Sequence, residues 1–291
     1  MLKMWRKKAL TGGKQLFIHE TPGEKGTVIG VHGLTGHHMQ LGHFQKALEK
    51  QYRMITYDLN GRGKSSNADN NSNIDQHVQE LIELIKVLKI DRPILMGYSI
   101  GANICLKAAT LIDVEALILI DGAGEVDQGQ KELILPSLIR LEQSYLSRLD
   151  YINLIRNTYE KHGVRWSEHM NRIVNYEIEK SNDYWVHKSN HNIIKKDFLS
   201  LFQFDLEHLA EQVDCPVMLI QANGTLGKRP FYYESQYKKL EKRLLQIEVV
   251  KTKENHLTIV FNKHAELEWK LLDFLNRNTL SYVAPSVRHE K

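Results

Sequence analysis

One short segment of the sequence, Gly97-Tyr-Ser-Ile-Gly101, places a serine where it could act as a nucleophile. It directly follows an apolar run at residues 94–96, typical of a buried strand, and it opens a helical pattern over residues 100–109. In a sharp strand-to-helix turn, a side chain is lifted clear of the sheet and lies at the helix N-terminus, which favours negative charge. The flanking glycines let the strand and the helix approach each other closely. We therefore predict that Ser99 is a nucleophile.

The elements that must position Ser99 alternate along the chain between short apolar runs and helical patterns. The apolar runs, typical of strands buried on both faces, lie at residues 27–31, 53–57, 94–96, 117–120, 217–220 and 246–250. Between the second and third runs, Val78, Leu81, Ile82 and Ile85 recur at helical spacing, and this pattern ends before Pro93. Strands that alternate with helices predict an α/β fold with a doubly wound, mostly parallel sheet.

Residues 123–212 interrupt this alternation. They show no pattern of a buried strand and are rich in aromatic residues. Their apolar residues recur at helical spacing, as at Leu138, Leu141, Tyr145 and Leu149. Because an insertion in a parallel sheet lies over the carboxyl ends of the strands, where ligands bind, we expect a helical cap over residues 123–212. The core would then comprise residues 1–122 and 213–291, with most of the aromatic side chains packed inside the cap and the others lining a substrate pocket.

Three further motifs follow predicted strands. His32-Gly-Leu-Thr-Gly36 comes after the first run, Asp58-Leu-Asn-Gly-Arg-Gly-Lys-Ser65 after the second, and Asn255-His256 after the last. Together with the segment around Ser99, they resemble the α/β-hydrolase superfamily across nearly the whole chain. The resemblance makes Gly97–Gly101 the nucleophile elbow of that family and His32–Gly36 its oxyanion loop. One departure is Asn60, which stands where the family often has arginine or proline.

The resemblance also implies a mechanism. Ser99 would attack a carbonyl carbon, and His256 would accept its proton as general base and return it to the leaving group. The backbone N–H groups of Leu34 and Ile100 would form the oxyanion hole. The rival histidine, His264, falls within a C-terminal helical pattern. The chemistry requires no organic cofactor and no metal.

A cluster of three more histidines follows the oxyanion loop, at His37, His38 and His43. Their spacing matches none of the usual metal-binding patterns, so we expect no metal site there.

The acid of the catalytic triad is harder to place. The family commonly carries it after the penultimate strand, but residues 221–230 contain no carboxylate, and Thr225 stands where the acid is usually found. In some members the acid follows the preceding strand, which here ends in Asp121. We expect Asp121 to complete the triad. Glu254, or no carboxylate at all, are the alternatives.

Composition places the chain among globular proteins of one or two domains. Of its 291 residues, 42% are hydrophobic and 25% charged, which excludes a disordered chain or a coiled coil. The 39 basic and 35 acidic residues, a net charge of +4, are interleaved, so we expect no nucleic-acid partner. The longest apolar run, residues 116–120, is far shorter than a membrane span. The basic residues at the N-terminus are not followed by an apolar stretch, so we expect no secretory signal. Two cysteines cannot form a disulfide framework, and we expect a cytoplasmic protein.

These inferences together favour a carboxylesterase-like serine hydrolase. It would cleave an ester, thioester or lactone through an acyl-Ser99 intermediate, in a small-molecule substrate with an acyl or aromatic portion. Three alternatives remain open. They are a carbon–carbon bond hydrolase with the same serine and histidine, a non-catalytic ligand-binding or signalling protein on the same fold, and a cofactor-free oxygenase or lyase. No motif predicts an oligomeric state.

Overall fold

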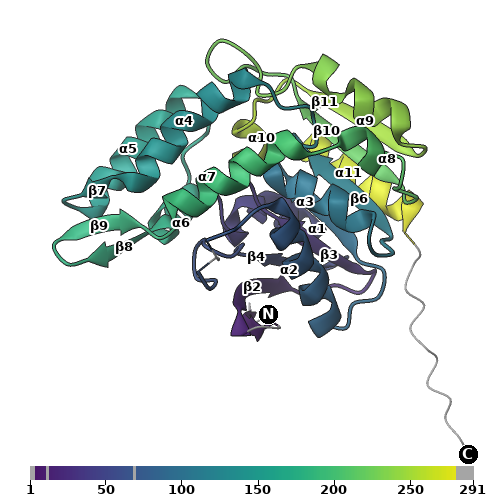
Figure 1. Ribbon diagram of the computed structural model, residues 1–291, viewed down its shortest axis with the longest axis horizontal. Coiled ribbons are helices and arrows are strands. Elements are labelled where there is room, and N and C mark those ends of the chain that lie inside the picture. The colour runs from purple at the N-terminus through teal and green to yellow at the C-terminus, as the bar shows by residue number, and fades with distance from the viewer. Residues whose placement is uncertain (1–3, 11–12, 68–69, 280–291) are drawn as a thin grey trace, which may run out of the picture.

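The computed structural model describes residues 4–10, 13–67 and 70–279, and its core is an eight-stranded sheet with the order β1-β2-β4-β3-β5-β6-β10-β11 (Figure 1). The strands are β1 (Met4–Ala9), β2 (Gln15–Thr21), β3 (Thr27–Val31), β4 (Arg53–Tyr57), β5 (Ile94–Tyr98), β6 (Ala116–Ile120), β10 (Val217–Ala222) and β11 (Ile247–Thr252). The pairs β1–β2 and β2–β4 are antiparallel, and the pairs from β4 to β11 are parallel. The predicted mostly parallel sheet is confirmed.

The central strands are buried on both faces. Every residue of β5, β6 and β10 is buried, because successive apolar side chains point to opposite faces and helices cover each face. Leu95, Leu117 and Leu219 belong to one hydrophobic cluster, and their neighbours Met96 and Ile118 belong to the other.

The N-terminal hairpin β1–β2 was not expected from the sequence. The sequence of β1, Met-Trp-Arg-Lys-Lys-Ala, has three basic residues in a row and shows no apolar run. A strand at the edge of a sheet pairs on one side only and tolerates such charges, so a search for buried runs misses it.

Helices flank the sheet. The core helices are η2 (His38–Leu41), α1 (Gly42–Leu48), α2 (Ile74–Val87), α3 (Ile100–Ala109), η4 (Glu234–Tyr237), α9 (Lys238–Arg243), α10 (Thr258–Phe261) and α11 (Ala265–Asn278). Asn73 caps the N-terminus of α2, because its side chain accepts a hydrogen bond from the backbone N–H of Gln76, and the helix ends well before Pro93. Helix α3 spans the residues predicted from the sequence and begins directly after Ser99.

The chain between β6 and β10, residues 123–212, carries a run of helices and short strands, which we call the inserted segment. It contains α4 (Gln128–Glu142), β7 (Ser144–Tyr145), α5 (Arg148–Lys161), α6 (Glu168–Glu177), β8 (Ile178–Ser181), β9 (Tyr184–His187), α7 (His191–Ser200), η3 (Leu201–Gln203) and α8 (Leu206–Ala210). Figure 1 shows α4, α5 and the three short strands projecting away from the core. The small antiparallel sheet, with the order β7-β9-β8, was not expected from the sequence.

The continuous helical pattern assigned to Leu138, Leu141, Tyr145 and Leu149 was wrong. Helix α4 ends at Glu142, Tyr145 lies on β7, and Leu149 is exposed on α5. The break has a local cause, because Ser147 and Asp150 form a capping box that starts a new helix.

Some of the aromatic residues do pack inside the inserted segment. Tyr145 and Tyr151 lie in its hydrophobic cluster with Ile155, Val174 and Ile178. Along the described chain, no helix has both the length and the apolar character needed to cross a bilayer.

Candidate active site

Ser99 lies in a strained turn between β5 and α3. Its backbone torsions are φ 55° and ψ −121°, a region that L-residues rarely adopt. A Cβ atom at Gly97 would lie 2.1 Å from the backbone oxygen of Gly101, and one at Gly101 would lie 2.2 Å from that of Val31. Both positions therefore require glycine, and the turn places Ser99 at the start of α3, as the sequence predicted.

His256 and Asp121 meet at the carboxyl edge of the sheet. The Asp121 Oδ2 atom lies 2.6 Å from His256 Nδ1. The other carboxylate oxygen, Oδ1, accepts hydrogen bonds from the backbone N–H of Ala222 and from the Tyr237 hydroxyl, each at 3.0 Å. Asp121 follows β6, and Ala222 is the last residue of β10, the strand paired with β6. The pairing of these strands therefore brings the Ala222 N–H to the Asp121 carboxylate. A carboxylate on Nδ1 favours the tautomer in which Nε2 is free to accept a proton.

The alternative acid, Glu254, pairs with another histidine, and the position where the family usually has the acid holds a threonine. Thr225 is exposed, and Glu254 lies 3.5 Å from His264, the rival histidine, which precedes α11. In the part of the chain that the structure describes, Asp121 is the carboxylate that pairs with His256.

Ser99 and His256 line the same cavity. Among the described residues, no hydrogen bond joins the Ser99 hydroxyl to the His256 ring. Such bonds are often long without substrate and tighten when it binds, so this geometry is compatible with proton transfer between the two residues.

Two aromatic residues that sequence reasoning missed hold His256 in place. The Phe231 ring stacks on the imidazole, with centroids 3.7 Å apart and an interplanar angle of 14°. The Tyr98 hydroxyl donates a hydrogen bond of 2.5 Å to the His256 backbone oxygen. Burial raises the pKa of Tyr98 well above its ordinary value, so it remains a neutral donor. Tyr98 directly precedes Ser99 in the sequence, so its place beside the active site could have been predicted. Phe231 lies in the loop after β10, where no sequence pattern indicates a role at the site.

Phe231→Leu is expected to lower kcat by about 2- to 12-fold, since an aromatic contact of this kind contributes ~0.5–1.5 kcal/mol. The substitution keeps an apolar side chain but removes the flat surface that orients the imidazole. Steady-state kinetics on an ester, the substrate class expected from the sequence, measures the effect. Phe202→Leu, at a half-exposed ring that does not line the cavity of Ser99 and His256, is the matched control and should leave kcat unchanged. Equal kcat values for the two variants would contradict a role for the stacked ring.

The predicted oxyanion loop is held by hydrogen bonds on several sides. His32 Nδ1 donates to the Gly33 oxygen at 2.7 Å, and His32 Nε2 accepts from the backbone N–H of Leu59 at 3.0 Å. Burial lowers the pKa of His32 to about 3, so the ring is neutral and has one donor and one acceptor nitrogen. Among the described residues, none accepts a hydrogen bond from the backbone N–H groups of Leu34 or Ile100. Both groups are therefore available to an oxyanion.

The cavity that Ser99 and His256 share has a volume of about 320 Å³. The inserted segment contributes Leu133, Ile134 and Tyr159 to its wall, and apolar residues of the core complete it. Its polar lining includes Gln40, Glu132, Ser137, Thr158 and His162. The site is thus mostly apolar, with a few polar groups, as is usual for small-molecule sites.

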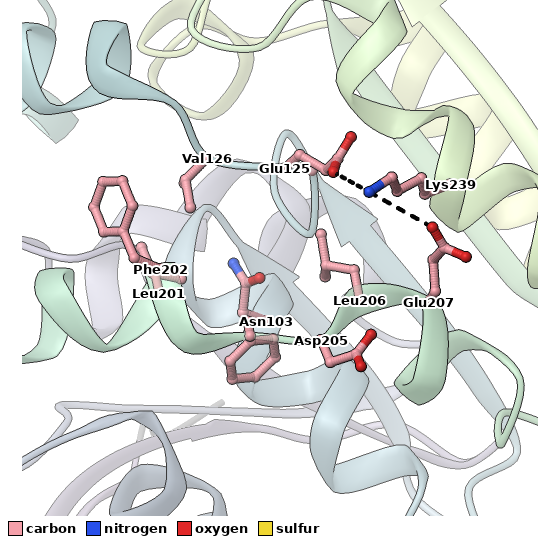
Figure 2. A pocket seen from close by; sticks show the side chains of 11 residues that line it. Asn103, Glu125, Val126, Leu201, Phe202, Asp205, Leu206, Glu207 and Lys239 are labelled. Carbon is pink, nitrogen blue, oxygen red and sulfur yellow. Dashed lines mark ion pairs between the residues drawn. The ribbon is translucent and has the colours of Figure 1, made fainter.

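A second cavity, of about 330 Å³, lies beside α3 and is shown in Figure 2. Lys239 crosses one side of it and pairs with Glu125 at 2.7 Å and with Glu207 at 3.6 Å. Neither Ser99 nor His256 lines this cavity, so we do not assign the chemistry to it.

His37, His38 and Asp58 lie close enough together to be considered as metal ligands. Asp58 accepts hydrogen bonds from the backbone N–H and the Nδ1 of His38, from the backbone N–H of Lys64 and from the Tyr176 hydroxyl. These contacts attach Tyr176 of the inserted segment to the core. His43 is not part of the cluster and lies 3.0 Å from the backbone oxygen of Phe261.

The two cysteines are poor candidates for a nucleophile. Cys105 is buried in α3, and burial raises the pKa of its thiol. Cys215 is half-buried, and burial raises its pKa to about 12. Neither is a thiolate at neutral pH.

Comparisons with known proteins point to one family. Residues 22–224 match the family model described as serine aminopeptidase, S33. An acetyltransferase component of the acetoin cleaving system of Pseudomonas putida, a dihydrolipoyllysine-residue acetyltransferase, is 33% identical over 42% of this chain. A putative esterase/lipase of Haemophilus influenzae is 31% identical over 32% of this chain. These matches span 35% and 33% of the length of the two curated relatives.

The fold comparison covers nearly the whole chain. The crystal structure of E-2-(acetamidomethylene)succinate hydrolase aligns with a TM-score of 0.80 and 16% sequence identity, over 94% of this chain and 100% of that one. Similarity at this level shows the fold, and the predicted α/β-hydrolase fold is confirmed.

Proposed function

The chain belongs to the serine aminopeptidase S33 family, and on that basis we propose that it is a serine hydrolase that cleaves carboxylic esters through an acyl-Ser99 intermediate. The observation that carries the proposal is the 2.6 Å contact between Asp121 and His256, whose ring lines the same cavity as Ser99. A nucleophile, a base and a residue that orients the base are the parts that acyl transfer requires.

The proposed reaction has two stages. Ser99 Oγ attacks the ester carbonyl carbon while His256 Nε2 accepts its proton, and the N–H groups of Leu34 and Ile100 stabilise the oxyanion. The tetrahedral intermediate expels the alcohol, which takes the proton from His256. Water then attacks the acyl-Ser99 carbonyl while His256 accepts its proton, and the second tetrahedral intermediate breaks its bond to Ser99 Oγ. Ser99 takes the proton back from His256, and the carboxylic acid is released. Asp121 stabilises the imidazolium in both stages.

The cavity supports a substrate with an acyl or aromatic portion of modest size, because its wall is mostly apolar and its volume is about 320 Å³. Thioesters and lactones fall within the same chemistry. We further propose that residues 123–212 form a cap domain over a core of residues 1–122 and 213–291, since α4 and α5 supply part of the cavity wall.

A panel of p-nitrophenyl esters of rising acyl length tests this function. We expect hydrolysis to be fastest for short or medium acyl groups and a fluorophosphonate to label Ser99, as read by peptide mass spectrometry. Labelling elsewhere with Ser99 unmodified in the folded protein, or no hydrolysis of any ester, would overturn the proposal.

A second candidate, aminopeptidase activity, is suggested by the family description and by Glu132. An aminopeptidase must bind an N-terminal ammonium group, and Glu132 places a carboxylate in the lining of the cavity. Aminoacyl p-nitroanilides, compared with N-acetylated ones, test this activity. Glu132→Gln should raise KM for the free amine if the candidate is correct, and it should leave KM for simple esters unchanged in either case.

We expect the arm formed by α4 and α5 to open and close over Ser99 on the microsecond-to-millisecond scale typical of lids. The Tyr176–Asp58 hydrogen bond ties α6 to the core, whereas α4 and α5 carry exposed apolar residues such as Leu135 and Leu149. Hydrogen exchange should therefore be faster in α4 and α5 than in β5. Protection of both helices equal to that of β5 would contradict a mobile lid.

A further inference from the structure

Arg62 is a fully buried charge that reaches three parts of the molecule. Its Nε donates to the backbone oxygen of Leu34 at 3.2 Å, and Nη1 donates to the backbone oxygen of Asn60 at 2.9 Å. Its Nη2 forms an ion pair with Asp197 Oδ2 at 2.6 Å. Asp197 lies on α7 of the inserted segment, so the guanidinium joins that segment to the oxyanion loop.

The contact with Leu34 restrains the backbone that carries the oxyanion donor. The N–H of Leu34 belongs to the same planar peptide unit as the Gly33 oxygen, which accepts from His32 Nδ1 at 2.7 Å and from the Gly36 N–H at 3.0 Å. The Leu34 oxygen belongs to the next peptide unit, and Arg62 holds it. Because the two soft torsions of Leu34 lie between these units, fixing both carbonyls fixes the direction of the Leu34 N–H.

Asp197 in turn fixes the guanidinium. It is fully buried, and its Oδ1 accepts from the Ser72 hydroxyl at 2.7 Å while Oδ2 lies 3.1 Å from His77 Nε2. Burial alone would raise the pKa of Asp197, but the charge of Arg62 and the hydrogen bond with His77 outweigh it and lower the pKa to about 2. The carboxylate is therefore charged at every pH at which the enzyme would work. A buried charge with its partner removed is strongly unfavourable, so the two side chains are expected to stay paired.

We propose that Arg62 and Asp197 form a positioning pair, in which Asp197 of the inserted segment orients Arg62, and Arg62 aims the Leu34 N–H at the oxyanion. Neither residue touches the substrate cavity, so both act through Leu34. The inference rests on the proposed hydrolase function, because an oxyanion hole matters only if a tetrahedral intermediate forms.

Arg62→Gln is expected to lower kcat about 10- to 100-fold with KM within about threefold, because the donor is misplaced and substrate binding is not lost. Asp197→Asn should act in the same direction with a smaller effect. The control is Glu177→Gln, which breaks another buried ion pair of the inserted segment, with Arg140 at 3.2 Å. Among the described residues, Glu177 contacts neither Leu34 nor Arg62. This variant should lower the unfolding midpoint but leave kcat near that of the unmodified enzyme.

The affinity for a boronic acid separates a positioning role of Arg62 from a purely structural one. The tetrahedral adduct of the boronic acid with Ser99 places an oxygen in the oxyanion hole, so its affinity depends on the direction of the Leu34 N–H. Arg62→Gln should weaken boronate binding by the same factor as it lowers kcat, while the affinity for the product carboxylic acid stays constant. If this variant does not fold, Arg62→Lys replaces it. Lysine keeps a charge near Asp197 but lacks the fork of N–H groups that also reaches Leu34, so the same loss is expected.

Two results would overturn the inference. One is a kcat for the Arg62 variants no lower than that of Glu177→Gln, and the other is unchanged boronate affinity. An unmodified enzyme that cleaves no ester and binds no boronate would overturn the proposed function and this inference together. An active enzyme with unaffected Arg62 variants would overturn the inference alone.

Discussion

Ser99→Ala is expected to lower kcat for ester hydrolysis by about 10⁶-fold, the scale seen when the nucleophile of a serine hydrolase is removed. The side chain of Ser99 caps no backbone N–H group of α3, so the substitution removes no hydrogen bond that stabilises the fold. The unfolding midpoint should therefore change little. Alanine is also the smallest side chain that can occupy the strained turn.

The matched control is Ser137→Ala, at a second serine that lines the same cavity. It should keep kcat within a few-fold of the unmodified enzyme. Hydrolysis of a p-nitrophenyl ester and thermal unfolding of the three proteins provide the comparison. Retention of more than a few per cent of kcat by Ser99→Ala would contradict the assignment of the nucleophile.

Asp121→Asn is expected to lower kcat by about 10⁴-fold, with substrate binding retained. Asparagine has the same shape as aspartate, and its amide oxygen can still accept from the Ala222 N–H and from Tyr237. Its NH2 group would then face His256 Nδ1 and donate to it. That contact places the ring proton on Nε2, the atom that must accept the proton of Ser99, and the variant also lacks the charge that stabilises the imidazolium.

Thr225→Ala is the control, because Thr225 stands at the position where the family more often carries the acid of the triad. Thr225 is exposed, so this substitution should change kcat by less than about twofold. A kcat for Asp121→Asn within tenfold of the unmodified enzyme would contradict the role of Asp121.

The contact between Asp121 and His256 was predicted from the family resemblance together with the positions of the strand ends. Asp121 follows β6 and His256 follows β11, the two strands that flank β10, and the carboxyl ends of parallel strands lie at one edge of the sheet. The same reasoning places Ser99, which follows β5. The apolar runs were recognisable because these strands are buried on both faces.

Other parts of the site depend on contacts that no local pattern encodes. Phe231 stacks on His256 because of the path taken by the loop after β10, and Tyr237 reaches Asp121 from η4. Arg62 and Asp197 are far apart in sequence, and each would be read alone as a surface charge, whereas the fold buries both against each other. Such pairs follow from tertiary structure and not from residue spacing.

The most direct test of the account is whether a covalent intermediate forms on Ser99. A p-nitrophenyl dialkylcarbamate is a suitable probe, because a carbamoyl-serine hydrolyses much more slowly than an acyl-serine. Intact-mass and peptide mass spectrometry after incubation should find one carbamoyl group per chain, on Ser99, with one p-nitrophenolate released for each adduct. Ser99→Ala should give neither. Release of p-nitrophenolate by the folded protein with no adduct, or with the adduct on another residue, would contradict the acyl-Ser99 mechanism.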